Sequence, residues 1–388
     1  MQSEFLTIDN VAALVDFCKR VKGSSWLAVD TEFEREKTFF PELCLIQIAN
    51  ADIAAVIDPL VLDNLEPVFD LLYDISITKV FHSARQDLEL FYNIKGKVPT
   101  PLFDTQLAAP LLGYADQVGY GNLVKQALGV DISKAHTRTD WKRRPLSKSQ
   151  LQYAVNDVIY LGKIYVQFLD KLTNYNRLAW LGDDFSALSD SDLYEPDPDS
   201  VWLKIRSANR LKGNNLSVLQ KLAAWREVTA RLVNRPKKWL LSDDAIFDVA
   251  KLLPTDADDL SRMKSLNDGL IKRHGTDLLR VIEEAKQQAP IPLQKKDKQR
   301  ALSAQDEAMM DVLTAIVRLR AQKENLNPTI LASRKELESL VRGEASTSVL
   351  KGWSEHIIGN EVRDFLSGKL SLQVVEEQLS VLSGQIKK

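Results

Sequence analysis

Short apolar runs of strand length occur only in the first part of the chain, and this restricts the folds that are open to it. The runs are WLAVD at 26–30, LCLIQIA at 43–49, IAAVID at 53–58 and KVFH at 79–82. Between and after them, as far as residue 172, apolar residues recur three and four apart, as in helices that bury one face. Strands mixed with helices predict an α/β domain built in layers.

Two proline-containing segments divide the 388 residues into three blocks. Residues 182–200 are acidic, residues 289–300 end in a basic run, and each segment contains two prolines. Proline lacks a backbone donor and disfavours helix in the residue before it, so both segments are predicted to be linkers. The second and third blocks contain no strand-like runs and are predicted to be all-α. We therefore predict three domains: 1–190, 205–288 and 300–388.

The two helical blocks also resemble each other. Each has an arginine ten residues before a proline, in the pairs Arg226/Pro236 and Arg318/Pro328. In both blocks an apolar cluster, a polar cap and an amphipathic helix follow that proline. The similarity indicates a duplicated small helical domain, and chance similarity between two helical segments is the alternative.

The net charge of −2 conceals a strong asymmetry along the chain. Residues 1–200 contain 19 Lys and Arg against 29 Asp and Glu, residues 201–300 contain 21 against 12, and residues 301–388 contain 11 against 12. The three blocks therefore carry net charges of −10, +9 and −1. This pattern favours a carboxylate-rich site beside a module that binds polyanions, with a chance distribution of surface charge as the alternative.

Nothing in the sequence indicates export or membrane insertion. No stretch approaches the ~20 apolar residues of a membrane helix, and the N-terminus lacks the basic start and apolar run of a secretory signal. Only two cysteines, Cys18 and Cys44, are present, which is too few to staple a chain of this length. We therefore expect a cytoplasmic protein without membrane attachment, and we expect a monomer.

Two acidic residues end the first long apolar run. Asp30 and Glu32 are two residues apart, so on a strand both side chains project from the same face. Like charges placed so close repel each other unless a cation lies between them. A solvated strand end is the alternative if this pair is considered alone.

Two further carboxylates lie at similar boundaries. Asp87 follows the run KVFH near the start of a predicted helix, where a simple preference of acids for helix N-termini is the alternative. Asp157 lies four residues after Tyr153, so a helix presents both on one face, beside apolar neighbours that make a lone carboxylate costly. Tyr153 alone is equally typical of a packed core aromatic.

Four carboxylates without a histidine or cysteine partner suit a hard cation such as Mg²⁺ or Mn²⁺. Two such ions about 3.5–4 Å apart form a clamp for phosphodiester hydrolysis. Tyr153, with an ordinary pKa of about 10, is a poor base at neutral pH, so we expect it to orient the attacking water.

Three segments resemble the exonuclease motifs of the DEDD superfamily, tyrosine subtype. They are DTEF at 30–33, HSARQDL at 82–88 and YAVND at 153–157, in the order typical of that superfamily. The stretch from residue 136 to 161 is similar to the corresponding part of bacterial ribonuclease D, and the helical blocks resemble its two HRDC domains. One departure is Ser83, where many relatives have asparagine.

The resemblance implies a ribonuclease-H-like α/β fold, with a mixed β-sheet flanked by helices, followed by two all-α HRDC-like domains. It implies 3′→5′ hydrolysis that releases nucleoside 5′-monophosphates, acting on the 3′ ends of tRNA precursors and other small structured RNAs. It assigns two divalent metal ions, Mg²⁺ or Mn²⁺, to Asp30, Glu32, Asp87 and Asp157, and the positioning of water to Tyr153.

Substrate contacts are also expected near these motifs. His82 is a candidate contact to the terminal nucleotide, although a packed strand-end histidine explains it equally well. The basic loop with Arg138, Trp141 and Arg144 is expected to hold RNA phosphates and a stacked base, with a solvated loop as the alternative. Asp104 is expected to cap a helix N-terminus and not to be a fifth ligand.

Two other functions remain open from the sequence. A DNA 3′-exonuclease would share the same motifs, because the metals act on phosphate and only recognition of the 2′-hydroxyl separates RNA from DNA. A non-catalytic nucleic-acid-binding adaptor would be favoured by a missing carboxylate, and none of the four is missing.

Overall fold

A six-stranded mixed sheet forms the centre of the first domain in this computed structural model, which describes residues 5–132, 139–292, 300–344 and 347–383. The strand order across the sheet is β1-β4-β3-β2-β5-β6. The pairs β2/β3 and β3/β4 are antiparallel and the others are parallel. The strands are β1 (Leu6–Ile8), β2 (Trp26–Glu34), β3 (Glu42–Ala49), β4 (Ala54–Ile57), β5 (Thr78–Phe81) and β6 (Leu102–Asp104).

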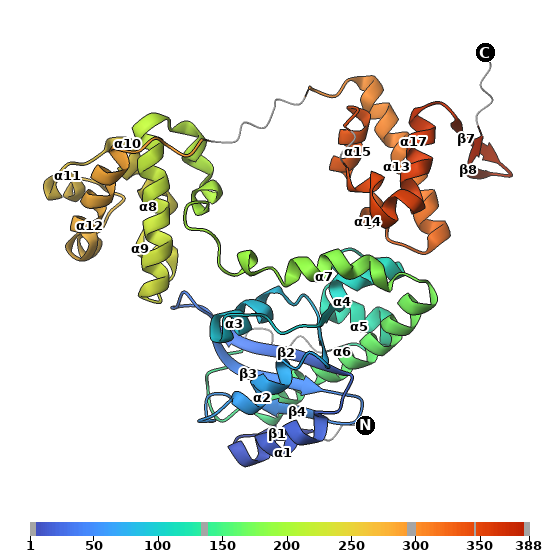
Figure 1. The fold of residues 1–388 in the computed structure, drawn as a ribbon, viewed down its shortest axis with the longest axis horizontal. Coiled ribbons are helices and arrows are strands. Elements are labelled where there is room, and N and C mark those ends of the chain that lie inside the picture. Colours follow the sequence, from blue (N-terminus) through green and yellow to red (C-terminus); the bar gives the residue numbers. More distant parts are fainter. Residues whose placement is uncertain (1–4, 133–138, 293–299, 345–346, 384–388) are drawn as a thin grey trace.

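Helices cover both faces of this sheet (Figure 1). Leu27 and Val29 of β2 pack in the core that contains α1 (Val11–Val21), α2 (Glu66–Leu72) and α3 (Arg85–Lys95). Ala28, which points to the other face, packs in the core that contains α6. Further helices of this domain are α4 (Thr105–Ala108), α5 (Tyr120–Leu128) and α7 (Gly182–Leu188).

The long helix α6 (Lys148–Asn174) fixes one face of the sheet. It begins at Ser147, whose side chain accepts from the backbone of Gln150 while the Gln150 side chain accepts from the Ser147 backbone, a reciprocal capping box. Gly162 allows close packing, because an added Cβ there would lie 2.7 Å from the Trp26 ring. The middle of α6 is thereby held against β2.

The first helical domain packs its own apolar core around the long helix α8. Its helices are α8 (Gly213–Leu232), α9 (Lys237–Leu240), α10 (Asp243–Leu252), α11 (Ala257–Ser261) and α12 (Asp268–Lys286). It touches the first domain through Asn234, whose Oδ1 accepts from the backbone N–H groups of Phe39 (3.0 Å) and Phe40 (3.1 Å).

The second helical domain packs on a different part of the first domain (Figure 1). The Asn327 backbone N–H donates to Pro110 O, and Arg177 donates to Leu111 O and Glu324 O. Trp180 and Trp353 stack at 4.5 Å between ring centroids. Its α-helices are α13 (Ala304–Glu324), α14 (Pro328–Leu331), α15 (Arg334–Val341), α16 (Gly352–Ser354) and α17 (Asn360–Leu366).

The expectation that residues 300–388 contain no strands was wrong. β7 (Leu370–Val375) and β8 (Gln378–Ser383) form an antiparallel hairpin. Its two-residue loop, Glu376 and Glu377, has positive φ at both positions (50° and 63°), as a type I′ turn requires. Glutamate is an unusual residue for that turn. The usual Asn-Gly signal is therefore absent, and the sequence does not predict the hairpin.

None of the described helices is long and apolar enough to cross a bilayer.

Candidate active site

Asp30, Glu32 and Asp157 meet in a pocket of about 630 Å³ between the second half of β2 and the N-terminal half of α6. One carboxylate oxygen of each lies within 4.8 Å of those of the other two. The strand spacing of two and the position of α6 against β2 produce this approach. We call this the carboxylate pocket, and its lining includes Asp30, Thr31, Glu32, Phe33, His82, Ser83, Gln86, Asp87, Tyr120, Tyr153 and Asp157.

Asp87 enters the carboxylate pocket from the first turn of α3. It is buried, and Thr31 Oγ1 donates to its Oδ1 at 2.5 Å. Thr31 lies between Asp30 and Glu32 in β2, so this hydrogen bond ties α3 to the strand that carries the other acids. The four predicted carboxylates therefore line one pocket, and three of them form its tight group.

Electrostatics in the carboxylate pocket oppose the charged form of every acid. Burial raises the pKa of Asp30 to about 6. Burial, and then the charges of Asp30, Asp157 and Asp87, raise the pKa of Glu32 to about 9. Burial and the charge of Asp30 likewise hold the pKa values of Asp87 and Asp157 well above their usual range. Hard oxygen ligands crowded in this way fit a divalent cation, which would remove the repulsion.

Tyr153 lies one turn before Asp157 on α6 and also lines the carboxylate pocket. Its ring stacks on Trp141 at 6.3 Å between centroids. Burial, followed by the charges of Asp157, Glu32 and Asp30, raises the pKa of its hydroxyl above the ordinary value. The phenol is therefore neutral at physiological pH and can direct a hydrogen bond, but it is not a proton acceptor.

Tyr120 is a pocket residue that the sequence did not reveal. It begins α5, and its hydroxyl donates to the backbone oxygen of Asp157. Burial raises the pKa of this hydroxyl well above the usual range. The contact fixes α5 against the helix that carries Asp157, and no local sequence signal marks it, because the two residues are 37 positions apart.

His82 and Asp104 hold the loop before α3 in place. The His82 ring nitrogens bond Thr105 Oγ1 and Val118 O, both at 3.0 Å, so neither is directed at solvent. Asp104 caps α4, as expected, by accepting from Gln106 N at 2.7 Å. It also accepts from the backbone N–H groups of Ser83 and Ala84. Ser83 takes a positive φ of 62°, so the Asp104 carboxylate supports an unusual backbone conformation there.

The predicted RNA-binding loop is only partly exposed. Arg138 lies outside the described residues. Trp141 is 6% exposed and packs in the core, so its ring is not available to stack on a base. Arg144 is partly exposed, and it donates to the Asp58 carboxylate and to Cys44 O and Trp141 O, which holds the loop against the sheet. The burial of Trp141 argues against a base stacked on its ring, whereas the role of Arg144 as an RNA contact stays a prediction.

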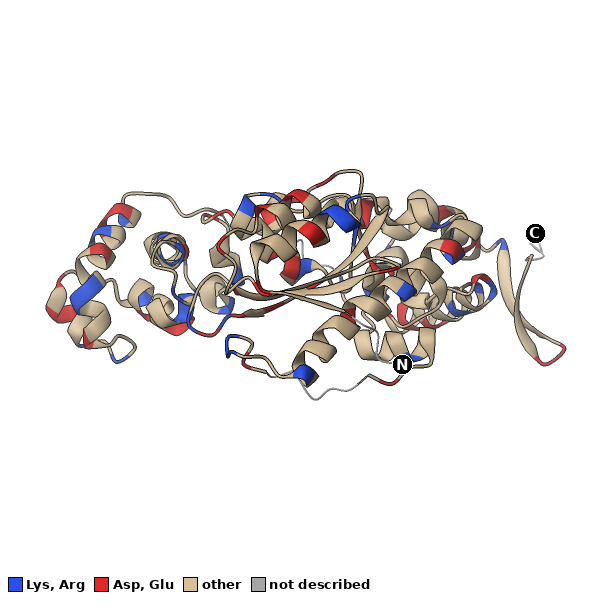
Figure 2. Ribbon diagram, turned by 90° about the horizontal axis from the view of Figure 1, so that it is seen from below, with Lys and Arg blue, Asp and Glu red and all other residues tan. Residues whose placement is uncertain are grey.

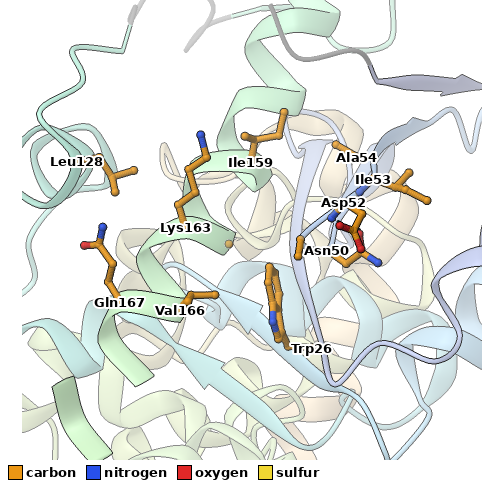
Figure 3. A pocket seen from close by; sticks show the side chains of 12 residues that line it. Trp26, Asn50, Asp52, Ile53, Ala54, Leu128, Ile159, Lys163, Val166 and Gln167 are labelled. Carbon is orange, nitrogen blue, oxygen red and sulfur yellow. Dashed lines mark hydrogen bonds between the residues drawn. The ribbon is translucent and has the colours of Figure 1, made fainter. Parts of the chain in front are cut away.

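A second pocket, of about 550 Å³, lies beside Trp26 and α6 (Figure 3). Ile53, Ile159 and Val166 give it an apolar lining, and Lys163 and Asp52 are its charged residues. It contains none of the four motif carboxylates. The carboxylate pocket is therefore the candidate active site.

Comparison with known families agrees with the architecture. A model described as 3′-5′ exonuclease matches residues 5–173, and a model of the HRDC domain matches residues 215–282. The chain is 37% identical over 379 residues to a ribonuclease D of Zymomonas mobilis, covering 96% of this chain and 97% of that protein. It is 36% identical over 383 residues to a ribonuclease D of Sphingobium indicum, covering 97% and 98%.

Two solved structures share the fold. Escherichia coli RNase D, described as an exoribonuclease involved in structured RNA processing, matches with a TM-score of 0.77 and 27% identity, over 94% of this chain and 99% of that one. The catalytic core of RRP6 from Trypanosoma brucei matches with a TM-score of 0.57 over 73% of this chain and 79% of that one. At 23% identity, the second match shows likeness of fold alone.

Proposed function

The chain belongs to the ribonuclease D family, and we propose that its carboxylate pocket is where it removes nucleotides from the 3′ end of RNA. As a ribonuclease D it is a 3′–5′ exoribonuclease that processes structured RNAs such as tRNA precursors. The observation that carries the site assignment is the approach of Asp30, Glu32 and Asp157 to within 4.8 Å. The products expected from this chemistry are nucleoside 5′-monophosphates.

The metal ligands in this proposal are Asp30, Glu32, Asp87 and Asp157, and the cations are two Mg²⁺ or Mn²⁺ ions. When bound, such ions supply Lewis acidity and a water that deprotonates near neutral pH. Metal binding requires the carboxylates to lose their protons, so binding must overcome the raised pKa of Glu32 and its neighbours. The hydrogen bond from Thr31 keeps Asp87 oriented toward the same pocket.

Tyr153 orients the attacking water in this proposal. Its neutral hydroxyl reaches the pocket from the same face of α6 as Asp157. Stacking on Trp141 restrains the ring, and so the direction of the hydroxyl. A fixed hydrogen bond to water lowers the entropy that must be lost on reaching the transition state.

A hydrolysis assay tests the site and the substrate class together. The protein is incubated with 3′-extended tRNA or with single-stranded DNA of matched sequence, in Mg²⁺, Mn²⁺ or EDTA, and the products are identified. We expect 5′-mononucleotides from RNA, none in EDTA, and recovery after the metal is restored. Full activity in EDTA would exclude the metal site, and equal hydrolysis of DNA would favour the broader assignment as a nucleic-acid 3′-exonuclease.

A further inference from the structure

A third pocket, of about 460 Å³, lies where the first helical domain meets the segment that follows β2. Arg35, Thr38 and Phe39 line one side, and residues of α8, α9 and the 3₁₀ turn Val201–Lys204 line the other. The hydrogen bonds from Phe39 and Phe40 to Asn234 close this junction. We call it the junction pocket. Arg35 of this lining is two residues after Phe33 in the sequence, and Phe33 lines the carboxylate pocket.

Positive charge predominates in the junction pocket. Its lining has five cationic side chains, Arg35, Lys204, Arg226, Lys237 and Lys238, against the three acids Glu36, Glu227 and Asp243. Within the described chain, neither Lys204 nor Lys238 forms an ion pair. Trp239, also in the lining, is 59% exposed. An exposed indole beside unpaired lysines suits a base and its phosphates.

Two buried polar atoms in this lining have no partner. Arg226 and Glu227 are 7% and 3% exposed. Arg226 Nη1 donates to Leu241 O and Asp243, and Glu227 pairs with Lys237 at 2.7 Å. Arg226 Nε and Glu227 Oε1 find no hydrogen-bond partner among the described residues. Both atoms are covered by protein, and a small side-chain shift would present a donor and an acceptor to the same ligand; leaving them unpaired costs free energy.

We propose that the junction pocket binds one ribonucleotide of the RNA, upstream of the residue being removed. Its 2′-hydroxyl, which is both donor and acceptor, pairs with Glu227 Oε1 and Arg226 Nε, while its base stacks on Trp239. Lys204 and Lys238 hold the adjacent phosphates. This assignment rests on the proposed function, because it requires an RNA 3′ end in the carboxylate pocket. It gives the enzyme a means of distinguishing RNA from DNA away from the metals.

Binding of the full chain to single-stranded RNA and DNA of one sequence tests this proposal. The chain carries Asp30→Asn so that the strand survives, and fluorescence anisotropy reports affinity. Trp239→Ala should weaken RNA binding by about 5- to 150-fold, the usual effect of losing one stacked base. Leu232→Ala, at a residue 83% exposed on α8 and outside the pocket, is the matched control. Equal affinities for Trp239→Ala and Leu232→Ala would overturn the proposal.

Glu227→Leu, which removes the acceptor, tests the 2′-hydroxyl contact separately, with circular dichroism to verify folding. It should reduce the preference for RNA over DNA, whereas Trp239→Ala should weaken both strands. An unchanged RNA-to-DNA ratio in folded Glu227→Leu would exclude recognition of the 2′-hydroxyl here. Hydrolysis of a dinucleotide by Leu232→Ala, with Asp30 intact, should match the wild-type rate. Failure of the wild-type protein itself to hydrolyse the dinucleotide would count against the proposed function and not against the pocket alone.

Gln47 carries an independent inference about the carboxylate pocket. It lies in β3 directly opposite Asp30 in the antiparallel register with β2. Opposed residues of such a pair project from the same face, with Cβ atoms roughly 4.5–5.5 Å apart. Gln47 is 0% exposed, and neither its Oε1 nor its Nε2 has a partner among the described residues. A buried primary amide therefore lies beside a proposed metal ligand with its hydrogen-bonding capacity unused.

The geometry points to Gln47 as a positioning residue that donates from Nε2 to Asp30 when the site is loaded. This role also rests on the proposed function. Outer contacts of this kind commonly change metal affinity by about 10- to 100-fold. Gln47→Leu should therefore bind Mn²⁺ about 10- to 100-fold more weakly by calorimetry. The metal-free variant should melt no lower than the wild type, since an unpaired buried amide has been removed.

This combination separates positioning from packing. Gln47→Glu keeps the shape and adds a charge, so it should lower the melting temperature of the metal-free protein. Addition of Mn²⁺ should restore that melting temperature. Wild-type Mn²⁺ affinity in Gln47→Leu would overturn the role. Absence of Mn²⁺ binding by the wild-type protein would instead count against the metal site itself.

Discussion

The carboxylate pocket and the junction pocket are similar in scale but opposite in charge and in construction. The first, of about 630 Å³, is built by β2, α3, α5 and α6 of one domain around four acids. The second, of about 460 Å³, is shared between two domains and is lined mainly by cations. Catalytic groups must be held in fixed geometry, and one packed core provides this. Electrostatic attraction of a polyanion acts over a longer range, so it does not require the cationic side chains to lie in one rigid domain.

The charge distribution along the chain fits catalysis in the carboxylate pocket and attraction of RNA by the helical domain. Residues 1–200 carry −10 and residues 201–300 carry +9. Acidic and basic residues are mixed along the ribbon of every domain in Figure 2, so the imbalance lies in the sums over each block. An acidic catalytic domain repels RNA except where cations neutralise it. The comparison therefore predicts that chemistry and capture can be lost separately.

The largest expected effect is loss of a carboxylate. Asp30→Asn, Glu32→Gln, Asp87→Asn and Asp157→Asn should each lower kcat by at least about 10³-fold, because each removes several kcal/mol of metal-dependent stabilisation of the transition state. Hydrolysis of 3′-extended tRNA measures this, and tRNA affinity should remain close to wild type. Asp52→Asn, at an exposed acid outside the carboxylate pocket, is the control. A fully active Asp157→Asn would remove the basis of the two-metal proposal.

Tyr153→Phe should have the next largest effect. Losing the hydroxyl that orients water should lower kcat by roughly 10²-fold and leave KM nearly unchanged, because the contact matters mainly in the transition state. Steady-state kinetics on the same tRNA distinguish the two parameters. Tyr160→Phe, on the same helix but outside the pocket lining, should behave as wild type. An unchanged kcat in Tyr153→Phe would return this residue to a packing role.

The motif residues could be placed from sequence because their grouping follows from local geometry. Asp30 and Glu32 share a strand face, and Tyr153 and Asp157 share a helix face. Arg144 could not be placed in this way, since its partners Asp58 and Cys44 are 86 and 100 residues away. A loop whose arginine faces RNA and a loop whose arginine binds a carboxylate of its own domain have the same composition. Only the tertiary fold decides between them.

The helical repeat shows a similar limit. In each helical domain a short helix begins at or directly after the proline of the repeat, Pro236 or Pro328. Ser242 and Ser333 cap the helix that follows it. Arg226 is nevertheless buried in the junction pocket, whereas Arg318 is exposed. Sequence similarity predicted the common arrangement of helices. It did not predict which of the two arginines lines a pocket, because that depends on the domain each copy packs against.

Removal of the helical domains should separate capture from chemistry. A chain that ends at residue 195 should still hydrolyse a short oligonucleotide but bind tRNA far more weakly. Each lost single-strand phosphate contact flattens the plot of log K against log salt by about 0.7, so losing three to five should reduce its slope by roughly 2–3.5. Affinity at several salt concentrations, with Asp30→Asn in both proteins, measures this. Equal slopes, from a shortened protein shown to be folded, would leave the helical domains a structural role only.

The smallest expected effect is on the stability of the metal-free protein, and its sign follows from the crowded acids. Burial raises the pKa of Asp30 to about 6 and that of Glu32 to about 9. An acid whose pKa is higher in the folded than in the unfolded chain binds more protons when folded. Its contribution to stability is therefore lost as pH rises from about 4, the unfolded value, through the folded value.

Between about pH 5 and pH 9, the metal-free melting temperature should consequently fall. A loss of 1 kcal/mol in a domain of this size lowers it by about 2–4 °C. Glu32→Gln removes the group with a pKa of about 9 and should flatten the upper part of this decline. Saturating Mg²⁺ or Mn²⁺ should abolish the decline in the wild type, because the cation stabilises the same deprotonated carboxylates that repel each other without it. Differential scanning fluorimetry in EDTA and in metal measures both effects. The same decline in wild type and Glu32→Gln, unaffected by metal, would mean that the acids near Glu32 do not repel one another as their spacing requires. The carboxylate pocket would then need a cation no more than the junction pocket does.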